Sequence, residues 1–157
     1  GLSIELVFSE LNDQVVIALL LSFSLRAVAL TVILSVAGGW GAFFVLLAVA
    51  SASRAAMVWH WNTLPSARSN GVAAAVGAPE EGAATLALVS GTVVFVALVT
   101  FAAGIVAALF GLALLAAAAR QWTTMVRSRL GGHTGDTIGA TQQISETVCL
   151  TTLALLL

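Results

Sequence analysis

The chain has 157 residues, of which 60% are hydrophobic and 8% are charged, and its mean hydropathy is +1.07. Soluble domains carry about 25% charged residues, so this composition excludes a soluble globular domain. Six arginines and seven acidic residues give a net charge of −1, and without a basic field the chain is not expected to bind nucleic acid.

The first apolar stretch, residues 14–53, contains a single charged residue, Arg26. As one helix it would be about 60 Å long, whereas a bilayer core is about 30 Å thick, so the chain must fold back. The sequence GGWG at 38–41 suits a reversal, because glycine tolerates turn conformations and tryptophan favours the membrane interface. We predict helices over 14–37 and 42–61.

The second apolar stretch, residues 83–119, contains no charged residue and would be about 55 Å long as one helix. Gly104 is the expected turn, which gives helices over 83–102 and 105–129. A last helix is predicted to begin near Gly139 and to run to residue 157. The predicted fold is an all-α polytopic integral membrane bundle of about five transmembrane helices, forming one membrane domain over 1–157.

Most of the basic residues fall on one side of this topology. They are Arg54, Arg68, Arg120, Arg127 and Arg129. The two hairpin turns on the other side contain none, so the positive-inside rule assigns the arginine side to the cytoplasm. Segments 62–82 and 130–139 are therefore expected to face the cytoplasm together, at the inner or plasma membrane of the cell.

The densest group of small, hydroxyl and ionisable residues is the segment 130–143, with the sequence LGGHTGDTIGATQQ. Gly131, Gly132 and Gly135 allow backbone N–H groups to face an anion, and Thr134 adds a hydroxyl. Asp136 can hold a cation in such a phosphate-binding loop. Alternatively, the segment is an ordinary glycine turn in which Asp136 caps the following helix.

Two charged residues are expected deep in the bilayer, where an unpaired charge is costly. Glu146 lies about 15 Å along the last helix from Asp136 and shares a helix face with Gln143. Arg26 lies near the middle of the first helix, far from an end that would let it reach the interface. We expect Arg26 and Glu146 to pair in the bundle interior, either as part of a site or as a purely architectural ion pair.

Other polar residues allow two interpretations each. Arg54 and Arg68 are either anion binders or ordinary membrane anchors. His133 is either a ligand in the glycine loop or a structural residue. His60 stands between two tryptophans and fits the aromatic belt at a membrane interface.

Residues 130–146, with the sequence LGGHTGDTIGATQQISE, resemble the C-terminal signature of the adenosylcobinamide-GDP ribazoletransferase family, also called cobalamin synthases. Two upstream stretches are similar to that family in the same order, SRAAMV at 53–58 and LPSARSNG at 64–71. The resemblance extends over about residues 20–157.

The resemblance implies a magnesium-dependent phosphotransferase of cobalamin biosynthesis. It implies transfer of the cobinamide-phosphate part of adenosylcobinamide-GDP to α-ribazole, or to its 5′-phosphate, with release of GMP. Arg68 and Asp136 would be catalytic, Asp136 as a supporting metal ligand or an orienter of the attacking hydroxyl. Substrate would be bound by Arg26, Arg54, Gly131, Gly132, His133, Thr134, Gly135, Gln143 and Glu146. The lipid bilayer is an expected partner, and a homo-oligomer is left open.

The family also has an acidic motif of the DGLADxxDG type in its N-terminal part, thought to bind the metal, and no Asp-Gly pair occurs in this sequence. The chain therefore resembles the C-terminal portion of the family, with the main magnesium ligands expected in the N-terminal part. We expect no turnover from this chain alone. Two alternatives are a small transporter fragment, with Arg26 and Glu146 on the path, and a non-catalytic membrane scaffold.

Overall fold

The computed structural model describes residues 2–67 and 77–157, with side chains described from residue 13 onward. In these ranges the chain is almost entirely helical. The helices are α1 (Leu2–Thr63), α3 (Glu81–Ala103), α4 (Ile105–Leu130) and α5 (Gly135–Leu156). The predicted all-α class is confirmed.

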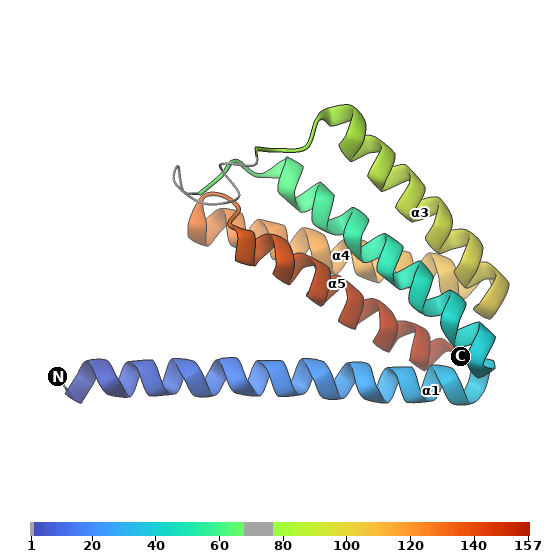
Figure 1. Ribbon diagram of the computed structural model, residues 1–157, viewed down its shortest axis with the longest axis horizontal. Helices are drawn as coiled ribbons and strands as arrows, with labels where there is room; N and C mark the ends of the chain where they lie inside the picture. Colours follow the sequence, from blue (N-terminus) through green and yellow to red (C-terminus); the bar gives the residue numbers. More distant parts are fainter. Residues whose placement is uncertain (1, 68–76) are drawn as a thin grey trace.

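Helix α1 contains the predicted reversal. Gly38 has φ 69° and ψ −179°, which are not helical values, and Figure 1 shows the helix turning back on itself. The glycine run was expected to break the helix over 38–41. Within α1 only Gly38 leaves the helical conformation, because one residue with positive φ is enough to redirect the chain. We call residues 2–37 the first arm of α1 and residues 39–63 the second arm.

The boundary between α3 and α4 agrees with the prediction, whereas the start of α5 differs from it. Gly104, with φ 87°, separates α3 from α4 as predicted. Helix α5 begins at Gly135, so the predicted start near Gly139 is wrong. The reason is local capping, since the side chain of Thr134 accepts a hydrogen bond from the backbone N–H of Thr137 and starts the helix there.

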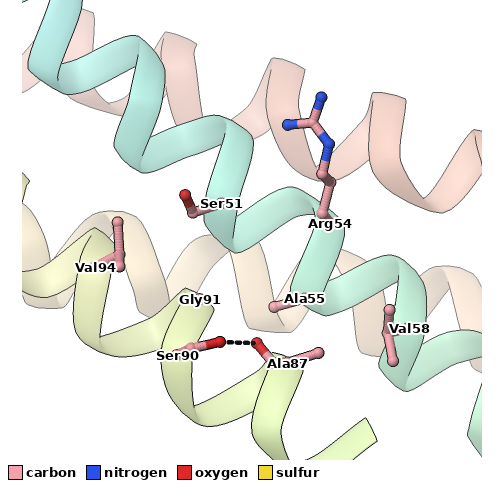
Figure 2. Close-up of a pocket in the computed structure, with 8 residues that line it drawn as sticks. All are labelled: Ser51, Arg54, Ala55, Val58, Ala87, Ser90, Gly91 and Val94. Atoms are coloured by element: carbon pink, nitrogen blue, oxygen red, sulfur yellow. Dashed lines mark hydrogen bonds between the residues drawn. The ribbon is translucent and has the colours of Figure 1, made fainter. Parts of the chain in front are cut away.

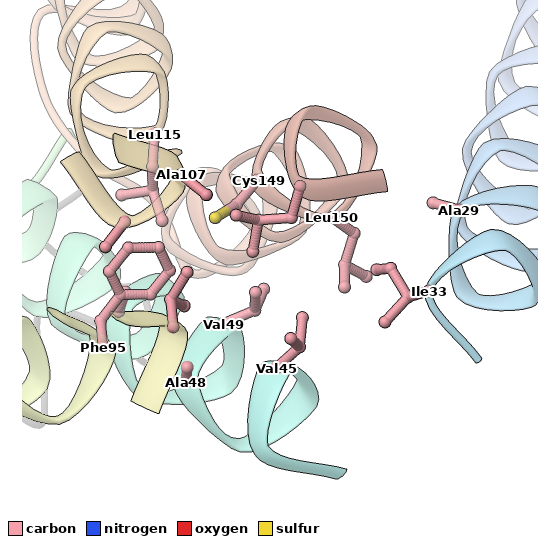
Figure 3. Close-up of a cluster of buried hydrophobic side chains, with 14 of the residues drawn as sticks. Ala29, Ile33, Val45, Ala48, Val49, Phe95, Ala107, Leu115, Cys149 and Leu150 are labelled. Carbon is pink, nitrogen blue, oxygen red and sulfur yellow. The ribbon is translucent and has the colours of Figure 1, made fainter. Parts of the chain in front are cut away.

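The hydrophobic core lies between the second arm of α1 and helices α3, α4 and α5 (Figure 3). Val45, Phe95 and Leu153 are completely buried in it. The first arm of α1 contributes Ala29 and Ile33, both close to the reversal. Figure 1 shows this arm diverging from α5 towards the N-terminus of the chain, so the first arm is only partly packed on the bundle.

Three of the described helices are long and apolar enough to cross a membrane, namely α1 from Asp13, α3 and α4. The expected number of about five spans is not confirmed. The count takes α1 as a single span although its two arms reverse at Gly38, and α5 carries threonine, serine and glutamine side chains that lower its hydropathy. Phe23, Trp40 and Phe101 are more than two-thirds exposed on the outer surface. Such a surface is consistent with a membrane protein.

The connections between the helices lie at two opposite ends of the bundle. Figure 1 shows the turn between the two arms of α1 and the turn between α3 and α4 at one end, together with the C-terminus. Residues 65–67, just after α1, and the turn between α4 and α5 lie together at the other end, which we call the loop end. The expected proximity of segments 62–82 and 130–139 is confirmed for residues 65–67 and 133. Residues 68–76 lie outside the described part, and the cytoplasmic orientation of both segments stays a prediction.

Replacing Gly91 by alanine is expected to push α3 away from α1. An added Cβ would lie 2.7 Å from the Ala55 Cβ and 3.0 Å from the Ser51 carbonyl oxygen. Overpacking of this kind costs about 1–3 kcal/mol, which should appear as a lower free energy of unfolding in lipid–detergent micelles. Gly82→Ala is the control, because nothing lies within 4 Å of its added Cβ. Equal stability of the two variants would contradict the close packing of α1 and α3.

Candidate functional site

Two segments that are far apart in the sequence pair at the loop end. The Ala67 N–H donates to the His133 carbonyl oxygen at 2.9 Å, and the His133 N–H donates to the Pro65 carbonyl oxygen at 2.8 Å. Ser66 and His133 thereby form a parallel β-bridge. We call residues 64–67 and 131–134 the loop junction. It joins the start of the LPSARSNG stretch to the start of the glycine loop.

Gly132 makes this close approach possible. A Cβ at this position would lie 2.4 Å from the Pro65 carbonyl oxygen and 2.8 Å from the Ala67 nitrogen, both of which are backbone atoms. A backbone neighbour cannot turn aside as a flexible side chain can. Any other residue at 132 would therefore force the two segments apart.

The N-terminus of α5 follows directly from the junction. The Thr134 side chain caps the helix, and the Thr137 hydroxyl accepts a hydrogen bond from the Thr134 N–H at 2.9 Å, which completes a capping box. Asp136 is exposed in the first turn, so the alternative in which Asp136 is the N-cap is wrong. Its carboxylate lies where the positive end of the helix dipole stabilises a negative charge.

Both histidines are buried beneath or within the junction. His60 is 0% exposed, and its Nδ1 lies 2.7 Å from the Thr123 hydroxyl of α4. Its Nε2 lies 3.5 Å from the Thr137 hydroxyl of α5. The assignment of His60 to an interfacial aromatic belt is therefore wrong, because the ring points inward and joins three helices.

His133 is buried as well, and its Nδ1 has no hydrogen-bond partner in the described part of the structure. Burial lowers the pKa of His133 below its ordinary value, because a charged imidazolium loses hydration there. The ring is therefore neutral at pH 7. Its free nitrogen leaves one polar atom at the junction available to a ligand or a water molecule.

Arg26 is held by α5 through three groups. Its Nε donates to the Thr147 hydroxyl at 2.8 Å, and its Nη2 donates to the Gln143 carbonyl oxygen at 2.9 Å. Its Nη1 lies 3.9 Å from Glu146 Oε1, with both side chains partly exposed. The expected pair is present, but it is partly exposed and does not lie in the bundle interior, and Arg26 also donates two shorter hydrogen bonds to α5. Gln143 takes part through its backbone carbonyl group.

Of the two arginines expected to bind substrate, Arg54 and Arg68, the structure describes only Arg54. Arg68 lies outside the described residues. Arg54 is exposed, donates from Nη1 to the Ala50 carbonyl oxygen at 3.1 Å and borders a hollow of about 270 Å³ between α1 and α3. Figure 2 shows its side chain extending away from α3. Arg54 lies about 13 Å along the helix axis from Thr63, so the structure does not bring it to the glycine loop.

A larger groove of about 1150 Å³ opens between the first arm of α1 and α5. Val15, Leu19 and Ser22 line it from the first arm, and Thr147 lines it from α5. Asp136 also borders this groove. The groove therefore runs from the Arg26 contacts to the first turn of α5, close to the loop junction.

The described residues do not form a metal site by themselves. They contain no group of three or more histidine, cysteine, aspartate or glutamate side chains able to hold an ion. Magnesium prefers several oxygen ligands in near-octahedral geometry. Asp136 therefore does not form a magnesium site without ligands from elsewhere.

The structure defines a class of protein, the apolar helical bundles with polar groups at one end. In this chain the polar groups gather at the loop end, where two segments that are far apart in the sequence pair. A family model described as cobalamin-5-phosphate synthase matches residues 15–154. The chain therefore belongs to the cobalamin-5-phosphate synthase family.

The chain is also similar to curated proteins named adenosylcobinamide-GDP ribazoletransferase. It is 47% identical over 149 residues to the protein of Sinorhizobium medicae and 49% identical over 150 residues to that of Rhizobium meliloti. Each alignment includes 94% of this chain and 56% of the relative. The protein of Bradyrhizobium diazoefficiens is 36% identical over 142 residues, which is 90% of this chain and 52% of the relative. The chain thus spans about half the length of these relatives, and no solved structure matches it.

Sequence reasoning missed the polar contacts beneath the junction. His60, Thr123 and Thr137 come from three helices, and their meeting depends on how these helices pack. One signal was available. Ser53, Ala56 and His60 repeat at spacings of three and four residues, and all three are buried, which marks the inward face of α1.

Gly132→Ala should open the loop junction. The added Cβ clashes with the backbone of residues 65–67, so at least one of the two bridging hydrogen bonds must break. We expect faster proteolytic cleavage at the junction and a loss of about 1–3 kcal/mol in the free energy of unfolding. Gly139→Ala is the matched control within α5, since nothing lies within 4 Å of its added Cβ. Protease resistance equal to that of the control would show that the segments do not touch.

Arg26→Met should destabilise the protein more than Glu146→Gln. The ion pair is 3.9 Å long and partly exposed, so its loss should cost less than about 1 kcal/mol. Removing Arg26 also removes two shorter hydrogen bonds to α5 and should cost about 1–3 kcal/mol. Denaturant unfolding in mixed micelles measures both values. The opposite order would mean that charge pairing, rather than hydrogen bonding, holds the first arm on α5.

Proposed function

We propose that the protein to which this chain belongs transfers the cobinamide-phosphate part of adenosylcobinamide-GDP to α-ribazole or its 5′-phosphate. Family membership and the names of the relatives support this reaction. The observation that carries the proposal is the loop junction, in which the Pro65–Ala67 backbone pairs with His133. The two polar stretches that resemble the family's motifs thus meet at one place.

The proposed reaction is a phosphoryl transfer. A ribose hydroxyl oxygen of α-ribazole attacks the phosphorus atom that is bonded to cobinamide. A new O–P bond forms, the bond between that phosphorus and the bridging pyrophosphate oxygen breaks, and GMP leaves with the bonding electrons. The hydroxyl proton is lost to a base or to water. Such reactions depend on positioning and on neutralising the phosphate charge.

The glycine loop offers the groups that this chemistry needs. The capping box uses the Thr137 N–H, whereas the N–H groups of Gly135 and Asp136 have no carbonyl group one turn earlier in the helix. These two amides at the start of α5 can bind a phosphate oxygen. The Thr134 hydroxyl accepts a hydrogen bond from Thr137, so its own proton remains available to the same phosphate. We propose that Gly131, Gly132 and His133 shape this cradle.

Arg68 is the better candidate for the pyrophosphate than Arg54. Arg68 follows Ala67 directly in the chain, and the Ala67 N–H donates to the His133 carbonyl oxygen in the loop junction. Arg54 lies in a separate hollow, so it would contact a more distant part of the substrate. We propose that Arg26, Gln143 and Glu146 act by holding the first arm of α1 beside α5 and thereby shape the groove next to the cradle.

Magnesium is proposed as the cofactor, with Asp136 as one supporting ligand. Ligands from outside the described residues would have to complete the site, and the bound ion would supply positive charge next to the pyrophosphate. We also propose that the protein is integral to the cell membrane with its loop end on the cytoplasmic side. The exposed apolar helices support this location, as do the arginines in the second arm of α1 and in α4.

The deciding experiment is a transferase assay on membranes. Membranes that contain a full-length family member carrying this segment should release GMP from adenosylcobinamide-GDP when α-ribazole and magnesium are supplied. Membranes that contain only this chain should release none, because Asp136 alone cannot bind magnesium well. Absence of GMP release by the full-length protein would overturn the proposed function.

Asp136→Asn should lower turnover in the full-length protein by about a hundredfold, if the carboxylate orients the attacking hydroxyl or supports the metal. Membrane insertion should not change, because Asp136 is exposed and outside the core. GMP release at saturating magnesium measures the effect. Asp13→Asn, a change at an exposed carboxylate in the first arm, is the control. Undiminished turnover would show that Asp136 only stabilises the start of α5.

A further inference from the structure

His60 occupies the point where α1, α4 and α5 meet below the loop junction. It is completely buried, and each of its ring nitrogens faces a threonine hydroxyl on a different helix. A buried ring with a short hydrogen bond to one helix and a contact with another is more constrained than an apolar residue of the same size, because rotating the ring would leave its buried N–H without an acceptor.

The hydrogen bond of Thr123 within α4 indicates which nitrogen of His60 carries the proton. Thr123 donates its hydroxyl proton to the Ala119 carbonyl oxygen at 2.8 Å, so towards His60 it can only accept. The His60 Nδ1 at 2.7 Å must therefore be the donor. In the neutral ring Nε2 is then an acceptor. The Thr137 hydroxyl donates its proton to the Thr134 carbonyl oxygen at 3.0 Å, so at 3.5 Å from Nε2 it is a packing contact and not a donor to the ring. His60 thus donates to α4 and packs against the start of α5.

The contact with Thr137 leads directly to the junction. Thr137 and Thr134 exchange two hydrogen bonds in the capping box, at 2.9 and 3.3 Å. Thr134 is the residue after His133, whose backbone pairs with Pro65 and Ala67. A shift of the imidazole would therefore move the start of α5 and the glycine loop together.

We propose that His60 is a positioning residue, which holds the start of α5 and the loop junction in register through its Nδ1–H bond to Thr123 and its contact with Thr137. The part of this inference that concerns turnover rests on the proposed function. The part that concerns the junction does not, and it is measured separately.

Substitutions can test the contributions of the two ring nitrogens separately. An asparagine amide nitrogen stands close to the position of histidine Nδ1, whereas a glutamine amide nitrogen stands closer to Nε2. His60→Asn should therefore keep the bond to Thr123, and His60→Gln should lose it. Thr123→Val removes the acceptor and Thr123→Ser retains it. Thr124→Val is the matched control, because the Thr124 hydroxyl bonds only within its own helix, to the Arg120 carbonyl oxygen, and is exposed.

The first measurement is hydrogen exchange of the Ala67 and His133 amides in the full protein in lipid nanodiscs. We expect His60→Gln and Thr123→Val to accelerate this exchange about tenfold, the effect of losing one buried hydrogen bond. His60→Asn, Thr123→Ser and Thr124→Val should stay within about twofold of the unchanged protein, well below that effect. The inference is overturned if His60→Gln and Thr123→Val behave like Thr124→Val, or if His60→Asn behaves like His60→Gln.

The second measurement is the split between kcat and KM for GMP release. His60→Gln and Thr123→Val should raise the KM for the GDP-linked substrate about tenfold or more, since misplaced binding groups lose affinity, while the amount of protein in the membrane stays constant. His60→Asn and Thr123→Ser should restore the KM. If the exchange results are as expected and even the unchanged protein releases no GMP, the positioning role at the junction stands and the proposed function fails. An unchanged KM in the variants with fast exchange would overturn the role of His60 in turnover.

Discussion

The close approach of the backbone of residues 65–67 to Gly132 is the constraint on which the loop end depends. Only a residue without a Cβ allows the two backbones to approach so closely, and the two hydrogen bonds of the β-bridge follow from that approach. The bridge ties the segment after α1 to the turn before α5. Since Thr134 caps α5 in the next position, the start of the helix and the pairing of the loops are set together.

Helix α5 shows how a polar helix is accommodated in an apolar bundle. Several of its threonines return their hydroxyl protons to the carbonyl oxygen one turn earlier, as Thr141, Thr147 and Thr152 do. Its remaining polar face meets His60 near the loop end and Arg26 further along. Polar groups that would be costly in an apolar environment are thus paired within α5 or with a neighbouring helix. The buried hydroxyls of Ser145 and Thr151 are exceptions, with no hydrogen-bond partner in the described part of the chain.

The first arm of α1 is held less firmly than the second arm. It packs through Ala29 and Ile33 near the reversal and bonds to α5 through Arg26. Nearer its N-terminus it diverges and leaves the groove that Asp136 borders. Under the proposed function, this groove beside the proposed phosphate cradle would hold a bulky, amphipathic substrate next to the reacting groups, and this links the uneven packing of the bundle to the proposal.

The sequence by itself determined the helical class, the reversal at Gly38, the turn at Gly104 and the pairing of Arg26 with Glu146. These follow from local rules: a bilayer limits the length of an apolar helix, glycine permits a positive φ, and a deep charge needs a partner. The start of α5 was misplaced, because Thr134 captures the Thr137 N–H and a search for apolar residues does not register that hydrogen bond. The tertiary structure alone decided that His60 meets Thr123 of α4 and Thr137 of α5. That outcome depends on the distances between helices, which no spacing within a single helix contains.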